Sequence, residues 1–212
     1  MKGRTLFSSL VYSSCKEKTE FLIETTKLHE NEMLAHLGKY KLRANVQIEQ
    51  TDLKVFVVSK DGLKDPRCNE LPMRLLNINS TPTEHLENLN DYEKQRFLNG
   101  IAEGDEIPVG ENVPFDFNFD LLNGVDFEKG CYLGQELIIR THHSGVVRKR
   151  CVCIKHNGQL SIGQRLGPTG RECQIIAVKE NLALAIVKLD SIPMLSGPNV
   201  EFMIPSYLQH LQ

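Results

Sequence analysis

The sequence predicts an α+β protein in which helices are layered on short strands and a β-rich part follows. The chain has 212 residues, of which 41% are hydrophobic and 25% charged, a composition that allows a globular protein with a substantial core. Before residue 145, strand-like runs alternate with segments of helical spacing. After it, short β-rich runs are separated by Gly and Pro, which is typical of a small antiparallel barrel or sandwich.

Charge and hydropathy exclude two broad classes of protein. The 25 Lys and Arg residues oppose 27 Asp and Glu, a net charge of −2, so the composition does not indicate a nucleic-acid-binding protein. The longest apolar runs have only a few residues, far fewer than the roughly 20 that cross a bilayer, so we expect no membrane span. Six cysteines with no secretory signal before them indicate a reducing compartment.

Residues 6–23 predict a β-hairpin. β-Forming residues occupy positions 6–7, 10–12 and 21–23, and a charged turn at 16–18 precedes the last run. The first 16 residues also have the composition of an organelle transit peptide, because they are basic, rich in serine and free of acids. We favour the hairpin because the strand pattern continues beyond the turn.

A helix and two strands are expected next. Between residues 27 and 42, Met33, Leu37 and Tyr40 have the spacing of one helical face. Apolar runs at 46–48 and 55–58, on either side of the polar turn 50–52, predict two strands. This interleaving favours a sheet layered with helices over a bundle or a sandwich.

A loop, a strand and a helical region complete the first part of the chain. Residues 60–72 are polar and rich in turn-forming residues, so they predict a loop and a seam, and residues 73–78 predict a strand. Thr81 begins a capping-box pattern, Asn90 repeats the cap, and Gly100 supplies a stop. Two short helices or one kinked helix fit this region equally well.

The segment 123–136 contains the residues most suggestive of chemistry. Its closely spaced glycines indicate a tight loop, and a helix is expected to begin near Glu136. Cys131 would then lie just before a helix N-terminus and beside Lys129, two features that favour a thiolate. We therefore regard Cys131 as the candidate reactive thiol, with a buried inert cysteine as the alternative.

Other functional patterns near this segment are weaker. His142 and His143 could complete a Cys/His hydrolase with Cys131, although sequence proximity does not place them in contact. These three residues lack a recognised zinc-ligand spacing, and the pair Cys151 and Cys153 lacks a second ligand pair, so we expect structural cysteines and no metal site. The basic residues 148–150 have no interleaved aromatic residues, which favours a solvated strand start over an RNA contact.

The run K-G-C-Y-L-G-Q-E at residues 129–136 resembles the signature of the YgfZ-related family. The eukaryotic members of this family are mitochondrial iron-sulfur cluster assembly factors. The opening residues 3–6 resemble the G-R-x-L strand of the family. Further likeness to the eukaryotic branch covers Tyr92, Arg96, 100–101, 103–104, 114–125, 140–143, 145 and 148–150.

The resemblance implies the fold of the glycine-cleavage T-protein, an aminomethyltransferase. Residues 1–143 would form folate-binding α+β layers, with a seam near 60–72, and residues 144–212 a small C-terminal β-barrel. Family members normally have a further N-terminal stretch, with a targeting sequence and part of the folate-lining sheet. We therefore expect this chain to be N-terminally truncated relative to them.

The resemblance also implies site residues and ligands. Tetrahydrofolate is the implied cofactor, and a transient iron-sulfur cluster is the implied cargo. The candidate cofactor-binding residues are Asp116, Asn118, Lys129, Tyr132 and Gln135, with Asp116 standing where the family usually has Glu. The candidates for contact with a partner or a cluster are His142, His143 and Arg148.

The resemblance predicts an assembly factor of the mitochondrial matrix. Such a factor would support late formation or insertion of [4Fe-4S] clusters in client enzymes, together with A-type scaffold proteins. Cys131 would act through thiol chemistry, transient cluster contact or partner docking. One cysteine cannot hold a [4Fe-4S] cluster alone, because such clusters usually take four thiolates. The alternatives are a folate-dependent one-carbon (aminomethyl) transferase and a purely structural adaptor, and we expect no conventional enzyme.

Overall fold

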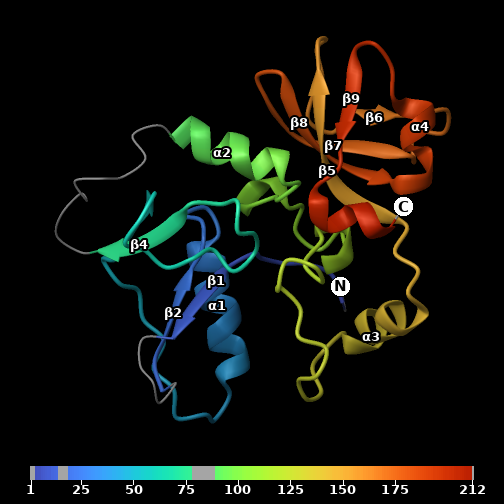
Figure 1. The fold of residues 1–212 in the computed structure, drawn as a ribbon. Coiled ribbons are helices and arrows are strands. Elements are labelled where there is room, and N and C mark those ends of the chain that lie inside the picture. The colour runs from blue at the N-terminus through green and yellow to red at the C-terminus, as the bar shows by residue number, and fades with distance from the viewer. Residues whose placement is uncertain (1–2, 14–18, 78–88, 212) are drawn as a thin grey trace.

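The computed structural model describes residues 3–13, 19–77 and 89–211. Two small antiparallel sheets and two helices form one part of the molecule, and a curved five-stranded sheet forms another (Figure 1). A third helix belongs to the segment that joins these two parts (Figure 1). This arrangement of helices and antiparallel sheets confirms the predicted α+β class.

The N-terminal hairpin is confirmed. Strand β1 (Leu10–Ser13) pairs antiparallel with β2 (Phe21–Glu24), with Leu10 opposite Glu24. The expected turn at 16–18 lies outside the described residues. Helix α1 (Glu30–Lys41) follows; Met33 is buried, whereas Tyr40 is exposed and packs on the ring of His36 instead of entering the core.

The second sheet contains two of the predicted strands. Strand β3 (Lys54–Val58) pairs antiparallel with β4 (Met73–Asn77), and the intervening loop is tied to the sheet by a bridge between Leu63 and Arg74. The strand predicted at 46–48 is wrong, because residues 42–53 form no strand and Val46 is 51% exposed. The short apolar run there pairs with none of the described strands.

Helix α2 (Leu89–Leu98) ends as the sequence predicts. Gly100 has φ of +60°, its N–H donates to the carbonyl of Phe97, and the N–H of Ile101 donates to the carbonyl of Arg96. These two bonds form a Schellman motif, which satisfies carbonyls that the end of a helix leaves free. The helix start expected at Thr81 lies outside the described residues.

Short 3₁₀ turns and one helix connect α2 to the large sheet. The turns are η1 (Gly104–Glu106) and η2 (Pro114–Phe117), and the helix is α3 (Gln135–Ser144). Gly134 and Gly145 flank α3 with φ of +87° and +67°. The helix predicted after Cys131 is therefore confirmed, and it begins four residues after this cysteine.

The large sheet has the strand order β6-β7-β8-β5-β9, and all neighbouring pairs are antiparallel. Its strands are β5 (Lys149–His156), β6 (Arg165–Leu166), β7 (Cys173–Lys179), β8 (Leu182–Lys188) and β9 (Val200–Met203). The sheet curves (Figure 1), but among the described residues no pairing joins β6 to β9. It is thus a half-barrel, and its first strand, β5, begins at Lys149.

Short turns and one short helix follow β8. They are η3 (Leu189–Ser191), α4 (Ile192–Leu195) and η4 (Ser206–Leu211). Leu208 in η4 is fully buried and packs with residues of β5 and β8. This C-terminal turn therefore covers one face of the half-barrel.

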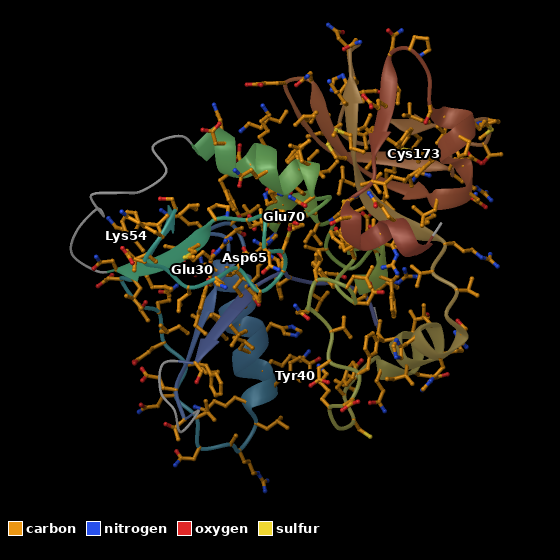
Figure 2. All side chains as sticks on the ribbon, viewed as in Figure 1. Glu30, Tyr40, Lys54, Asp65, Glu70 and Cys173 are labelled. Atoms are coloured by element: carbon orange, nitrogen blue, oxygen red, sulfur yellow. The ribbon has the colours of Figure 1, made fainter. Side chains whose placement is uncertain are left out.

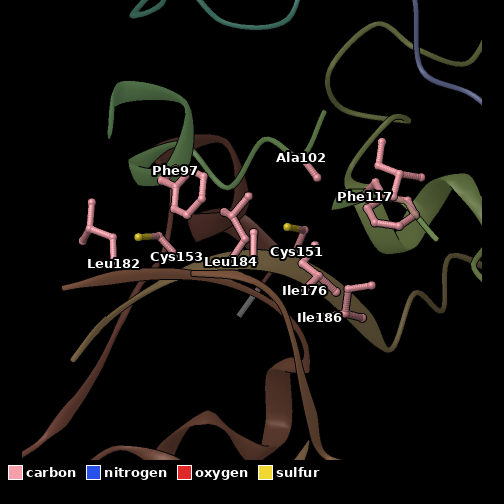
Figure 3. Packing of buried hydrophobic residues seen from close by; sticks show 11 residues of the cluster. Phe97, Ala102, Phe117, Cys151, Cys153, Ile176, Leu182, Leu184 and Ile186 are labelled. Carbon is pink, nitrogen blue, oxygen red and sulfur yellow. The ribbon is translucent and has the colours of Figure 1, made fainter. Parts of the chain in front are cut away.

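The core lies on both faces of β5. Cys151 and Cys153 point to the side of α2 and pack with Phe97 and Phe117 (Figure 3). Val152 and the alternate residues of β7 and β8 pack on the opposite side. The two cysteines thus share one face of β5, and both are fully buried. Within the described residues, no helix is long and apolar enough to cross a membrane.

Candidate functional site

The signature segment 129–136 forms a surface loop that leads into α3. The side-chain oxygen of Gln135 accepts a hydrogen bond from the Tyr132 N–H at 3.0 Å, and the Gln135 N–H donates to the Tyr132 carbonyl at 3.3 Å. A Cβ on Gly3 would lie 2.9 Å from the carbonyl oxygen of Gly134. The loop is thus held by Gln135 and lies against the N-terminal segment, which explains the glycine at position 3. Gly134 is favoured by its own φ of +87°.

Cys131 lies at the exposed part of this loop. In the part of the chain that the structure describes, four other cysteines are buried: Cys68, Cys151, Cys153 and Cys173. Burial raises the pKa of the Cys173 thiol to about 12, so a buried thiol of this kind stays protonated. Cys131 is therefore the accessible thiol among the described cysteines, and the alternative of a buried inert residue is excluded.

Lys129 and Tyr132 form one contact beside Cys131. The Lys129 ammonium lies 4.3 Å from the centre of the Tyr132 ring, which is cation–π geometry. The Tyr132 hydroxyl is buried without a hydrogen-bond partner among the described residues. Partial burial, together with the charge of Asp126, raises the pKa of Tyr132. This hydroxyl therefore stays protonated and is a neutral hydrogen-bond donor.

His142 and His143 lie in the last turn of α3 and are exposed. The His142 ring stacks on Phe127 with 3.7 Å between the ring centres, and Phe127 stacks in turn on the buried Phe115. The Cys131 thiol makes no hydrogen bond to any described residue, so the structure does not assemble the Cys/His pair of a hydrolase. Among the described residues, no group of three or more His, Cys, Asp or Glu side chains is placed to hold a metal ion.

Asp116 and Asn118 lie in the η2 turn, apart from the cysteine loop. Asp116 accepts hydrogen bonds from the Asn112 side chain at 3.1 Å and from the Val113 N–H at 3.3 Å. Asn118 is fully buried and donates to the Cys151 carbonyl at 2.7 Å, although its side-chain oxygen has no partner among the described residues. Asp116 thus caps its own turn, and Asn118 holds the end of η2 against the half-barrel.

The basic residues 148–150 have different environments. Arg148 is exposed, whereas Arg150 is buried and forms a two-bond ion pair with Asp120 at 2.6 and 2.9 Å. Arg150 also donates to the carbonyl of Phe115. The solvated strand start predicted at 148–150 is therefore wrong for Arg150, which anchors the start of β5 to the η2 turn.

A cavity of about 490 Å³ lies between the N-terminal part of the molecule and the segment that connects α2 to the large sheet. Its lining comes from the N-terminal segment with β1 and β2, from the loop before β4, and from residues 102–104 and 119–124. Apolar residues such as Phe7 and Phe119 line it beside the charged side chains of Glu24, Arg67 and Glu103. This mixture of apolar and charged lining is typical of a small-molecule site.

A buried ionic network borders this cavity, and sequence analysis missed it. Asp65 lies near the centre of the molecule (Figure 2), and its carboxylate pairs with Arg67 at 2.7 Å and with Arg74 at 2.8 Å. Glu103 accepts from Arg67, Arg74 and the Tyr92 hydroxyl. In the sequence, this network is indicated by Arg74, a charged residue within an otherwise largely apolar strand.

The network keeps its groups ionised. Burial alone would raise the pKa of Glu103, but the charges of Arg67 and Arg96 outweigh it and lower this pKa. Burial and the neighbouring Glu103 carboxylate raise the pKa of Tyr92 to about 12, so its hydroxyl remains a donor. The network therefore presents paired charges to the cavity, and neither Glu103 nor Tyr92 is poised to exchange a proton near neutral pH.

The residues that the resemblance assigns to folate do not surround one cavity. Asp116 and Asn118 are engaged in the η2 turn, while Lys129, Tyr132 and Gln135 belong to the surface loop. None of the five lines the cavity of about 490 Å³. The structure does bring together Lys129, Cys131, Tyr132 and Gln135 in one loop.

Fold and site together define a class: an α+β protein that ends in a half-barrel and displays an exposed cysteine in a loop before a helix. No protein-family model matches the chain. Curated relatives do match. The chain is 35% identical over 188 residues to the mitochondrial iron-sulfur cluster assembly factor IBA57 of Mus musculus, a match that covers 76% of this chain and 52% of the relative.

Two further relatives carry the same name. The human factor is 33% identical over 177 residues, covering 71% of this chain and 50% of the relative. The Yarrowia lipolytica homologue is 30% identical over 212 residues, covering 71% and 44%. The chain spans about half the length of the curated relatives it matches. It belongs to the YgfZ-related family, and the resemblance predicted from residues 129–136 is confirmed.

Proposed function

We propose that the protein is a mitochondrial iron-sulfur cluster assembly factor. The observation that carries this proposal is its 30–35% identity, over about three quarters of the chain, to factors that bear this name. The assigned step is the late formation or insertion of [4Fe-4S] clusters in client enzymes of the mitochondrial matrix. The exposed loop around Cys131 supports the proposal, because a protein that handles a cluster or a partner needs accessible chemistry.

Cys131 acts in this proposal with help from another protein. One thiolate supplies only one of the four ligands that a [4Fe-4S] cluster usually takes. Cys131 would therefore share a cluster with a partner, exchange a thiol or mark the docking position. His142, His143 and Arg148 are exposed and belong to the same region of α3 and its exit, so we assign them to contact with the partner or cluster.

The proposed partners are A-type scaffold proteins and [4Fe-4S] client enzymes. The half-barrel and the α+β layers support a T-protein-like fold. We propose that this chain, as a member of the family, has that fold. Tetrahydrofolate binding is a separate proposal, and no step of the assembly role depends on it. Titration of the purified chain with tetrahydrofolate, followed by fluorescence, tests it directly.

Two alternatives are less well supported by the site. A folate-dependent aminomethyl transferase needs an acid or base against the folate nitrogen, and Asp116, the one candidate, caps its own turn. A structural adaptor would not need an accessible thiol. Formation of methylenetetrahydrofolate by the purified protein would favour the transferase. Partner capture that survives substitution of every residue of the 129–136 loop would favour the adaptor.

Complementation tests the proposed function. Cells that lack their endogenous assembly factor receive this chain fused to a matrix-targeting sequence, and aconitase is assayed beside a [2Fe-2S] enzyme as control. Restored aconitase activity supports the assignment. Because the chain spans about half of its relatives, a second arm carries a full-length relative. Rescue by the relative alone would show that this chain is insufficient for the role.

A further inference from the structure

A second pocket, of about 340 Å³, lies on the half-barrel and is lined by four cationic side chains. They come from separate elements: Lys149 from β5, Arg165 from β6, Arg171 from the loop before β7 and Lys188 from β8. Among the described residues, no Asp or Glu belongs to the lining. A chain whose net charge is −2 thus concentrates positive charge in one small hollow. Cys173, labelled in Figure 2, lies in its wall.

Strand register explains why the cations meet. Lys149 lies directly opposite Lys188 in the antiparallel pair of β5 and β8. Arg165 on β6 lies opposite Gln174 on β7, and Gln174 lies opposite Ile186 on β8. Ile186 and Lys188 are two residues apart on β8, so their side chains share one face of the sheet. Three of the four cations therefore belong to one face at one end of the sheet.

This arrangement is unfavourable without a counter-charge. Like charges directly opposite each other in an antiparallel pair destabilise a sheet. Among the described residues, Lys149, Arg165 and Arg171 have no side-chain hydrogen bond or ion pair. Lys188 has one acidic neighbour, Glu172, at 3.8 Å.

Glu172 does not neutralise the pocket. Its carboxylate accepts hydrogen bonds from the Thr169 hydroxyl at 2.6 Å and from the Arg171 N–H at 3.0 Å, so it is committed to the turn before β7. These bonds lower the pKa of Glu172 to about 2, and the bond from the Thr169 hydroxyl has the largest effect. Its single negative charge leaves the four cations with a local excess of three positive charges.

We propose that this pocket binds a small polyvalent anion, a compound with two or more phosphate or carboxylate charges. Its size suits a small molecule, and the amide side chains of Asn112 and Gln174 add polar groups beside the cations. In the described part of the chain, no aromatic ring lines it, so those residues offer no stacking surface for a nucleobase. The site is separate from the Cys131 loop and does not depend on the proposed assembly function.

Calorimetric titration of the purified chain tests the site, with pyrophosphate and citrate as probes at constant ionic strength. Pyrophosphate represents a phosphate source and citrate a carboxylate source, and saturable binding of either supports the proposal. The double variant Lys149→Gln/Arg165→Gln should weaken this binding at least about tenfold, the loss expected when charge-assisted contacts are removed. The matched control Lys41→Gln/Lys155→Gln removes the same charge from exposed positions outside the pocket, and it should retain the wild-type affinity.

A stability measurement separates a binding role from a structural one. Without polyanion, the double variant should melt at the same temperature as the wild type or higher, because it relieves repulsion with Lys188. If that variant does not fold, Arg171→Gln provides the same test from an exposed turn. The proposal is overturned if neither probe binds, if the control weakens binding equally, or if only an acidic peptide binds.

Discussion

At the scale of single residues, the molecule separates its structural charges from its exposed thiol. Arg74 is buried beside Asp65, whose side chain is fully buried, whereas Cys131 is exposed on a loop. A charge can be buried only when partners compensate the lost hydration. The residues of the network are therefore expected to determine stability, and those of the loop to determine interactions.

Arg74→Met should destabilise the protein strongly. The substitution leaves the buried carboxylate of Asp65 with one fewer cation, and breaking such a buried pair costs about 3–5 kcal/mol. Urea unfolding followed by circular dichroism measures the change. Arg148→Met, at an exposed position, is the control and should alter the free energy of unfolding by less than about 0.5 kcal/mol. Equal losses in both variants would contradict the role assigned to the network.

Cys131 should react first with a thiol reagent in the native protein. Burial raises the pKa of Cys68 to about 11 and of Cys153 to about 12, so these thiols are both protected and protonated. The experiment uses a Cys15→Ser background, since Cys15 lies outside the described residues. Stopped-flow labelling should show one fast thiol, and Cys131→Ser should remove it. A fast phase that persists would contradict the assigned exposure.

At the scale of secondary structure, local sequence patterns predicted a strand correctly where another strand pairs with it. The strands at 55–58 and 73–78 were predictable because they pair with each other. The apolar run at 46–48 looks equally strand-like but has no partner, which a local pattern cannot reveal. The end of α2 was predictable because Gly100 adopts a conformation that other residues rarely adopt.

Gly100→Ala should therefore destabilise the protein. The position has φ of +60°, and a Cβ there would lie 2.8 Å from the carbonyl oxygen of Cys151, which belongs to the rigid β5 strand. Backbone strain and this clash together should cost about 2 kcal/mol or more. Thermal unfolding measures the loss. Gly158→Ala, where a Cβ meets nothing within 4 Å, should have little effect; similar losses at both positions would rule out this explanation.

The turn before β7 should make stability depend on pH through Glu172. The Thr169 hydroxyl and nearby N–H groups lower the pKa of this carboxyl from its ordinary 4.5 to about 2. A lowered folded-state pKa means that the stabilisation is complete above the unfolded pKa and is lost as pH falls through the folded pKa. The difference in melting temperature between wild type and Glu172→Gln should thus shrink from pH 5 towards pH 2. Glu201→Gln, at an exposed position, is the control. A constant difference would contradict the hydrogen-bonded turn.

At the scale of the whole molecule, sequence motifs predicted the class of protein better than its cavities. The signature at 129–136 identified both the family and the loop that carries Cys131. Neither cavity was predictable, because each is lined by residues from segments far apart in the chain, such as Glu24 with Arg67 or Lys149 with Arg165. Their proximity depends on strand register and tertiary packing, which spacing along one segment does not encode.

Depletion of this protein from its own cells, followed by parallel assays of aconitase and a [2Fe-2S] enzyme, tests the proposed role in late [4Fe-4S] cluster assembly. If the protein has this role, aconitase activity falls while aconitase protein and the [2Fe-2S] enzyme are maintained, and re-expression restores the activity. Unchanged aconitase after complete depletion, or an equal loss of both enzymes, would contradict a role in late [4Fe-4S] cluster assembly.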